Sequence, residues 1–167
     1  MSPEEDFQKE VLGLSQQAYG DRYRQDVLDL YKMYVASADK ISERRQTANA
    51  FFLTLNTTLV GLVGYLNFSR DPKEANPTIF ALVAMAGMLI CYMWYSMIRS
   101  YKNMNTGKFK VINTIEKMLP IRPYEAEWVA LEQGKNPRRY LEFSQVEKNI
   151  PRVFFLLHLV VLLMSIL

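Results

Sequence analysis

Two long stretches without charge constrain this chain more than any other feature of its sequence. No charged residue lies between Arg45 and Arg70, and none lies between Glu74 and Arg99, so each window holds 24 residues. As a helix, each window would be about 36 Å long, against about 30 Å of bilayer hydrocarbon. The overall composition, 50% hydrophobic and 22% charged, resembles that of a soluble protein only because the charges are gathered outside these windows. The sequence therefore predicts a transmembrane helical hairpin.

A third run without charge, residues 153–167, ends the chain and holds 15 residues. At roughly 22 Å it is short for a simple span. Two alternatives stay open: a third span, which would put the C-terminus outside, or a helix that lies along the hairpin. The acidic start MSPEEDFQKE lacks the basic segment and apolar core of a signal peptide, so we expect the first window to stay in the membrane.

The basic residues around the windows predict the orientation. Seven flank the two windows and two lie in the loop between them. The flanking set is Lys40, Arg44, Arg45, Arg99, Lys102, Lys108 and Lys110, and the loop set is Arg70 and Lys73. Because lysine and arginine near span ends favour the cytoplasmic side, we expect a multi-pass protein of the inner (cytoplasmic) membrane with a cytoplasmic N-terminus. In the loop, Asn76 and Pro77 predict the cap and first position of the second helix.

These patterns predict an all-α membrane protein: a transmembrane helical hairpin whose long helices extend into a cytoplasmic helical layer, plus a short apolar C-terminal helix. Residues 1–46 would form cytoplasmic N-terminal helices, and residues 47–98 the hairpin, with spans 47–68 and 78–98. Residues 99–151 would be a cytoplasmic helical segment. Residues 152–167 would be the apolar C-terminal helix, either a third span or membrane-associated.

The first span is predicted to be one half of a much longer helix, because no proline or glycine occurs from Arg22 to Val60. Apolar residues recur at alternating spacings of four and three across the boundary at Arg45, which is a heptad pattern. It runs through Val27, Tyr31, Tyr34, Ala38, Ile41, Ala48, Phe52, Leu55, Leu59, Leu62 and Leu66. We expect one helix of about 45 residues with a partner helix along its length. A helix with a separate soluble half is the alternative.

Polar residues inside the first span are its most informative feature. Asn49 and Asn56 are seven residues apart and share a helix face, whereas a broader side carries small residues. The candidate pore or helix-interface residues are Asn49, Asn56, Thr54, Thr57, Gly61 and Gly64; the second span offers a similar strip of Ala81, Ala84 and Gly87. Lipid supplies no hydrogen-bond partners, so these residues favour packing within the hairpin, contact between copies, or a wet pore. A pore needs several copies, since two helices cannot enclose one.

Side chains at the cytoplasmic ends of the spans have two interpretations. Arg44 and Arg45 anchor the first span at the headgroups, or in an oligomer form a cationic ring that binds anions or a nucleotide. Trp94 and Tyr95 are predicted to be interface aromatics at the membrane–water boundary.

Nothing in the sequence indicates an enzyme, a metal site or a cofactor. The one histidine, His158, and the one cysteine, Cys91, both lie in apolar runs, and we expect both to be packing residues. The net charge of +3 is too small to indicate nucleic-acid binding.

Four strings carry a resemblance to known families: RRQTANAFF (44–52), SYKNMNTGKFKVI (100–112), LPIRPYEAEW (119–128) and SQVEKNIPRVF (144–154). They resemble bacterial two-span membrane effectors of the SLATT type and, more closely, the RipA family of octameric membrane proteins. The resemblance implies a homo-oligomer, with an octamer as the suggested form. For the SLATT type it implies a membrane effector of prokaryotic conflict systems that forms pores when a cytoplasmic sensor or nucleotide signal acts.

Two functions are therefore expected. The first is an oligomeric inner-membrane protein that acts as a membrane effector or channel-like assembly of a defence system. The second is a non-conducting oligomeric scaffold whose cytoplasmic helices recruit a partner. A hydrated path through the assembly would distinguish them.

Overall fold

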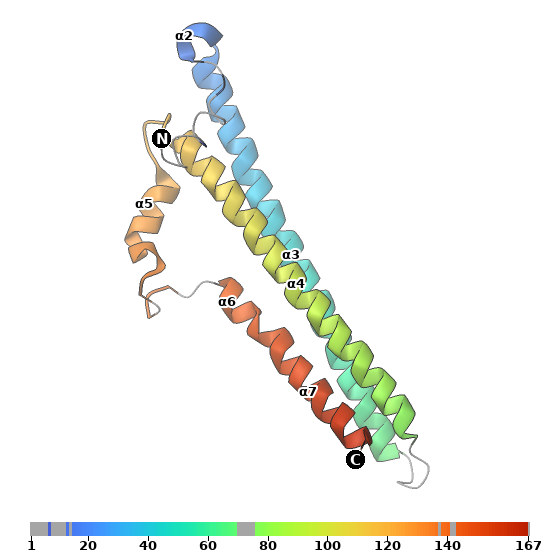
Figure 1. Ribbon diagram of the computed structural model, residues 1–167. Coiled ribbons are helices and arrows are strands. Elements are labelled where there is room, and N and C mark those ends of the chain that lie inside the picture. The colour runs from blue at the N-terminus through green and yellow to red at the C-terminus, as the bar shows by residue number, and fades with distance from the viewer. Residues whose placement is uncertain are drawn as a thin grey trace. The chain divides into compact units, whose positions relative to one another are not determined.

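The computed structural model describes residues 7, 13, 15–69, 76–136, 138–140 and 143–166, and every regular element in these ranges is helical (Figure 1). The elements are α2 (Gln16–Tyr19), α3 (Tyr23–Ser69), α4 (Pro77–Glu116), α5 (Pro123–Ala130), the 3-10 turn η1 (Glu132–Gly134), α6 (Phe143–Glu147) and α7 (Asn149–Ile166). The predicted all-α fold with long apolar helices is confirmed. Arg70 and Lys73 of the predicted loop lie outside the described residues.

The helix boundaries follow local sequence chemistry. Gly20 ends α2 with φ of 98°, a conformation that suits glycine, and α3 begins three residues later. α4 begins as predicted, with Pro77 at its first position and Asn76 Oδ1 accepting a hydrogen bond from the Thr78 N–H at 3.0 Å.

Two helices run without interruption from the charged flanks into the uncharged windows. α3 has 47 residues, in agreement with the predicted helix of about 45, and α4 has 40. Both helices contribute to two compact units. The polar unit comprises Met1–Ser42 and Asn103–Leu141, and the apolar unit comprises Glu43–Lys102 and Glu142–Leu167.

In the polar unit, α3 and α4 are antiparallel neighbours. Lys108 Nζ of α4 donates a hydrogen bond to Ser37 Oγ of α3 at 2.7 Å. Three residues of the heptad pattern are buried here, namely Val27, Ala38 and Ile41, and so are Ile112 and Ile115 of α4. The partner of this part of the pattern is therefore the chain's own α4, so the pattern by itself does not require a second copy.

In the apolar unit, α7 joins the hairpin formed by α3 and α4. The structure contains three described helices that are long and apolar enough to cross a membrane: Tyr23–Asn67, Pro77–Glu116 and Gln145–Ile166. The last combines the end of α6 with α7. It has 22 residues because it begins at Gln145, before the uncharged run that starts at residue 153. Its length satisfies the requirement for a span that the uncharged run alone did not meet.

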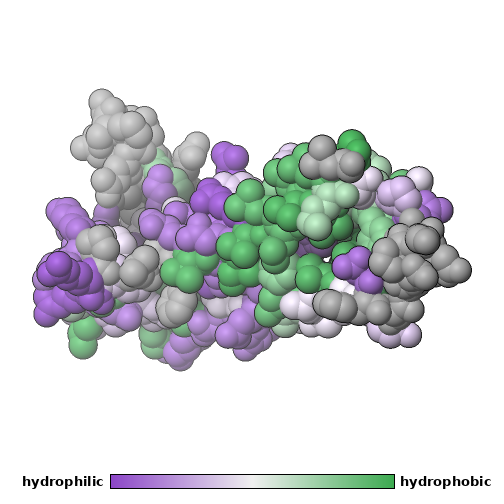
Figure 2. Space-filling model, turned by 90° about the horizontal axis from the view of Figure 1, so that it is seen from below, coloured by the Kyte–Doolittle hydropathy of each residue, from purple (hydrophilic) through white to green (hydrophobic). Residues whose placement is uncertain are grey.

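The helices of the apolar unit expose large hydrophobic side chains. Phe51, Leu89 and Leu156 are each about 60% exposed. Figure 2 shows hydrophobic residues gathered in a broad area of the surface rather than scattered singly. Such an area is unfavourable in water and favourable against acyl chains, which supports a membrane location.

Candidate functional site

A buried asparagine links three helices of the apolar unit. Asn56 of α3 has no exposed surface, and its Nδ2 donates a hydrogen bond to Phe52 O at 2.9 Å. Its Oδ1 accepts a hydrogen bond from Cys91 Sγ of α4 at 3.1 Å and lies 3.2 Å from His158 Nε2 of α7. The tautomer with a proton on His158 Nε2 makes this second contact a hydrogen bond. One amide thus contacts polar groups of three helices where lipid offers no partner, although His158 Nδ1 is buried without a partner among the described residues.

The ring of His158 occupies the space that a side chain at residue 87 would need. A Cβ atom built on Gly87 would lie 2.3 Å from His158 Cε1, far closer than any real contact. Gly87 and His158 are both buried. The absence of a side chain at Gly87 therefore lets α7 approach α4 closely.

A second polar contact joins α3 and α4. Trp94 Nε1 donates a hydrogen bond to Asn49 Oδ1 at 2.8 Å. The indole stacks on Phe52, with ring centroids 5.9 Å apart, and its centroid lies 6.3 Å from that of Phe154 in α7. Trp94 is only 1% exposed, so it packs between helices, and its predicted place at the membrane–water boundary stays a prediction. A buried indole N–H needs a partner, and Asn49 provides it.

Asn49 and Asn56 of the first span are thus both engaged inside one chain. Sequence reasoning treated Cys91 and His158 as separate packing residues and did not bring them to Asn56. The missing information was the position of α7, since His158 is 102 residues from Asn56. Tyr95, the other predicted interface aromatic, is half-buried and has the Arg152 guanidinium 5.4 Å from its ring centroid.

The small residues of α3 lie on a different face from Asn49 and Asn56. The other described helices of the same chain do not cover this face. Thr54, Thr57 and Gly61 are exposed, and Gly64 is half-buried. A Cβ atom added to Gly61 or Gly64 would meet nothing within 4 Å. At about 100° per residue, Thr54 and Gly61 lie roughly 140° around the helix from Asn49 and Asn56, respectively. Thr57 Oγ1 lies 2.9 Å from both Leu53 O and Thr54 O, so its hydroxyl is satisfied by its own helix.

The two arginines before the first span differ in their surroundings. Arg45 faces Glu147 of α6, with Nε 3.6 Å from Oε2 and both side chains 19% exposed. Arg44 is exposed and lines an open groove of about 620 Å³ between α3 and α4. Within the described residues, therefore, Arg45 pairs with a carboxylate and Arg44 does not.

The polar unit contains a buried carboxylate that sequence reasoning missed. Glu116, at the end of α4, has no exposed surface. It accepts hydrogen bonds from Tyr31 OH at 2.9 Å, Tyr124 N at 3.1 Å and Glu125 N at 3.3 Å. The two N–H groups belong to the first turn of α5, where a negative charge is favourable. A single acidic residue directly after Ile115 in an apolar stripe was the available signal.

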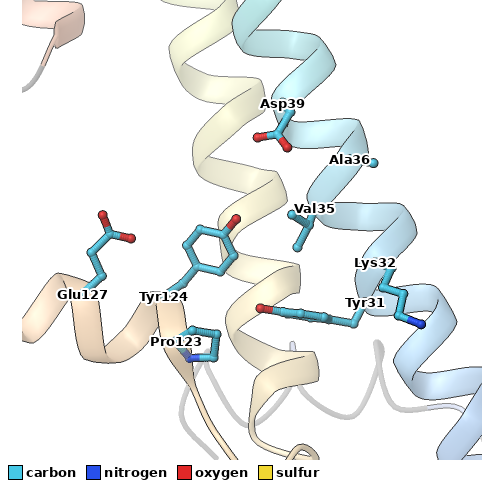
Figure 3. A pocket seen from close by; sticks show the side chains of 8 residues that line it. All are labelled: Tyr31, Lys32, Val35, Ala36, Asp39, Pro123, Tyr124 and Glu127. Carbon is cyan, nitrogen blue, oxygen red and sulfur yellow. The ribbon is translucent and has the colours of Figure 1, made fainter.

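Beside Glu116, the polar unit has an open hollow of about 510 Å³ (Figure 3). Tyr31 of α3 and Tyr124 of α5 line it, together with the carboxylates of Asp39 and Glu127. Neither of these carboxylates makes an ion pair with any residue that the structure describes. Lys32 also lines the hollow, but its ammonium lies 3.4 Å from the Asp29 carboxylate. The hollow therefore has an excess of negative charge.

The ionisation of the two tyrosines reflects this environment. Burial, the hydrogen bond to Glu116 and the negative charge of that group raise the pKa of Tyr31 to about 12. Burial, followed by the charges of Asp39 and Glu127, raises the pKa of Tyr124. A site with these properties suits a cationic group and disfavours an anionic nucleotide. Among the described residues, no group of three or more histidine, cysteine or acidic side chains is arranged to hold a metal ion.

Comparison with known proteins identifies one family. A model of the octameric membrane protein family (8xMP) matches residues 28–167, which is most of the chain. No curated protein and no solved structure matches it.

Proposed function

This chain belongs to the octameric membrane protein family, and from that membership we propose that its oligomer acts as a membrane effector or channel-like assembly of a bacterial defence system. The membrane location and the assembly of copies follow from the family and from the apolar helices. The defence role is proposed from the resemblance of the four strings to SLATT-type effectors and RipA proteins. Pore formation is proposed from α3.

The observation that supports pore formation is the open small-residue face of α3. Thr54, Thr57 and Gly61 are exposed in one chain, within a window that otherwise suits lipid. Small residues allow a neighbouring helix to approach closely, which large residues on the same face would prevent. Copies arranged around an axis with this face inward would bring their first spans together, and these spans would line or seal a central path.

We further propose that the assembly lies in the inner membrane with its N-terminal flank in the cytoplasm. The excess of lysine and arginine on the two long flanks supports this orientation. The polar unit would then receive the signal. Its hollow contains two carboxylates that pair with no described residue, so a basic partner segment suits this site better than a nucleotide does. A regulated assembly needs a closed state favoured by a few kcal/mol, which a ligand with differential affinity can reverse. The chain would perform no catalysis.

Flux measurements on Gly61→Leu test this proposal. Wild-type protein reconstituted in liposomes is expected to release a trapped dye, and Gly61→Leu is expected to abolish release and to lower the assembly mass in lipid discs. Leu62→Ala is the matched control, since Leu62 is the next residue, is 44% exposed and points away from the small face. Unchanged release and mass in Gly61→Leu would overturn the role assigned to this face.

The second candidate function is a non-conducting scaffold, and the hollow of the polar unit favours it. Two tyrosine rings and the carboxylates of Asp39 and Glu127 suit an arginine or lysine side chain of a cytoplasmic partner. This function predicts no dye release under any condition. It also predicts binding of a fluorescent arginine-containing peptide that Asp39→Asn and Glu127→Gln both weaken. Release by the wild type in the absence of any peptide binding would exclude the scaffold.

A further inference from the structure

The groove between α3 and α4 in the apolar unit has a polar end and an apolar end. It is open, has a volume of about 620 Å³, and is distinct from the buried cluster around Asn56. Glu43 and Arg44 line its polar end, and Phe51, Phe52 and Met97 line its apolar part. A ligand that fits this groove has a charged head and a hydrocarbon body.

The groove lies where the two uncharged windows begin and end. On α3, the chain passes from Glu43, Arg44 and Arg45 directly into the first window. On α4, Met97 lies inside the second window and Tyr101 lies just beyond Arg99, which closes it. In a bilayer, the polar end therefore lies at headgroup depth and the apolar part lies among acyl chains. Phe51 is 60% exposed, so the rest of the same chain leaves the apolar part of the groove uncovered there.

The two charges at the polar end have no partners among the residues that the structure describes. Neither the Glu43 carboxylate nor the Arg44 guanidinium makes a hydrogen bond or ion pair with any described residue, in contrast to Arg45, which pairs with Glu147. Neighbouring residues on a helix do not face each other, so the two charges are not positioned to neutralise one another. The groove therefore presents one free cation and one free anion, among the described residues, to the same ligand.

We propose that this groove binds phosphatidylethanolamine, a phospholipid whose headgroup carries one phosphate and one primary ammonium. The Arg44 guanidinium binds the phosphate, for which its planar fork of donors is suited. The Glu43 carboxylate accepts hydrogen bonds from the ammonium. One acyl chain lies against Phe51, Phe52 and Met97. An anionic lipid without an ammonium meets repulsion from Glu43, and a choline lipid lacks the N–H donors that Glu43 requires.

Native mass spectrometry of the delipidated assembly tests this assignment. The protein is titrated with phosphatidylethanolamine, phosphatidylglycerol and phosphatidylcholine of identical acyl chains. The wild type is expected to retain phosphatidylethanolamine about tenfold more tightly than the other two, since one charge-assisted hydrogen bond contributes about 1.5 kcal/mol. Arg44→Gln is expected to weaken retention of all three lipids, because all carry the phosphate. Glu43→Gln is expected to remove only the preference for phosphatidylethanolamine.

Arg99→Gln provides the matched control. Arg99 is an exposed cation at the same boundary but does not line the groove. Retention unchanged in Arg99→Gln supports a specific groove, whereas equal loss in Arg44→Gln and Arg99→Gln would overturn it in favour of general attraction by boundary cations.

Two further outcomes would also overturn the proposal. One is equally tight binding of free glycerophosphoethanolamine, because the acyl chain would then contribute nothing. The other is efficient photo-crosslinking from residue 51 to a second copy in lipid discs, because a neighbouring subunit would then fill the groove. Crosslinking from residue 51 to lipid alone supports the assignment.

Discussion

The His158 ring and the Asn56 amide meet inside the apolar unit, with His158 Nε2 3.2 Å from Asn56 Oδ1. The same oxygen accepts the hydrogen bond of the Cys91 thiol. The contact joins α7 to a hairpin whose own helices are already linked through Asn49 and Trp94. The third apolar helix is thus attached to the other two by a specific polar contact, in addition to general apolar packing.

Asn56→Leu is expected to destabilise the apolar unit, because it leaves the Cys91 thiol and the His158 ring without their common acceptor. The expected loss is about 1–2 kcal/mol, the range for a hydrogen-bonded polar group in a membrane helix contact. Unfolding in SDS, followed by Trp94 fluorescence in a Trp128→Phe background, measures it.

A double-mutant cycle of Asn56→Leu with His158→Leu is expected to give a coupling energy of about 0.6–1.7 kcal/mol. Ser165→Ala is the control, since the Ser165 hydroxyl bonds only to Leu162 O of its own helix. Additive effects of the Asn56 and His158 substitutions would mean that the two side chains do not interact.

Gly87→Ala is expected to displace α7, because the new Cβ would lie 2.3 Å from the His158 ring. Overpacking of this kind costs about 1–3 kcal/mol. The same fluorescence-detected unfolding measures it, with Gly107→Ala as control, since a Cβ there meets nothing within 4 Å and Gly107 lies in α4, outside the small-residue face of α3.

Combining Gly87→Ala with His158→Ser should recover part of the lost stability, because the smaller side chain removes the clash. If Gly87→Ala proved as stable as Gly107→Ala, the close approach of α7 to α4 at this position would be incorrect.

Tyr31 is expected to make the polar unit sensitive to alkaline pH. Its pKa is raised from the ordinary value of 10.0 to about 12, first by burial and then by its hydrogen bond to Glu116. Between these values the unfolded chain loses the tyrosine proton while the folded chain keeps it. The stabilisation is therefore fully present below pH 10 and is lost as the pH rises toward about 12.

Comparing the pH dependence of unfolding of the wild type and of Tyr31→Phe isolates this contribution. Tyr31→Phe should be less stable at neutral pH, where the hydrogen bond to Glu116 is lost, and should lose less stability between pH 9 and pH 11. Parallel curves for the two proteins would show that Tyr31 titrates normally.

Reversing the charge of Arg45 or Glu147 is expected to weaken the attachment of α6 to α3. Both side chains are only 19% exposed. Each single reversal is therefore expected to cost about 1–2 kcal/mol, which is more than the loss of a surface ion pair costs. Arg45→Glu combined with Glu147→Arg should restore most of the stability. Arg152→Glu is a control of equal charge change on the following helix, and no recovery in the double variant would exclude a direct pair.

Much of the architecture could be predicted from sequence because charge and periodicity are local properties. The absence of charge over 24 residues, together with the spacing of apolar residues, predicts long helices without reference to any other part of the chain. The start of α4 at Asn76 and Pro77 was predictable for the same reason, since a cap is made within a few residues.

The candidate sites could be predicted only in part. The sequence indicated that Asn56 needs a hydrogen-bond partner. A polar group of the same chain, a neighbouring copy or the water of a pore would each meet that need. Trp94 was predicted at the membrane boundary from its position along the helix, but its contacts with Asn49 and Phe52 were not predictable, because they depend on how α3 and α4 pack. Glu116 was overlooked because its partners Tyr31 and Tyr124 are brought to it by two different elements.

The sequence by itself determined that this protein is helical and places long uncharged segments in a membrane, because lipid tolerates no charge and no unpaired backbone over that length. Only the tertiary structure decided which polar groups meet, since a hydrogen bond between α3 and α7 depends on how helices rotate and approach one another. That rotation turns Asn49 and Asn56 inward and leaves the small residues of α3 open.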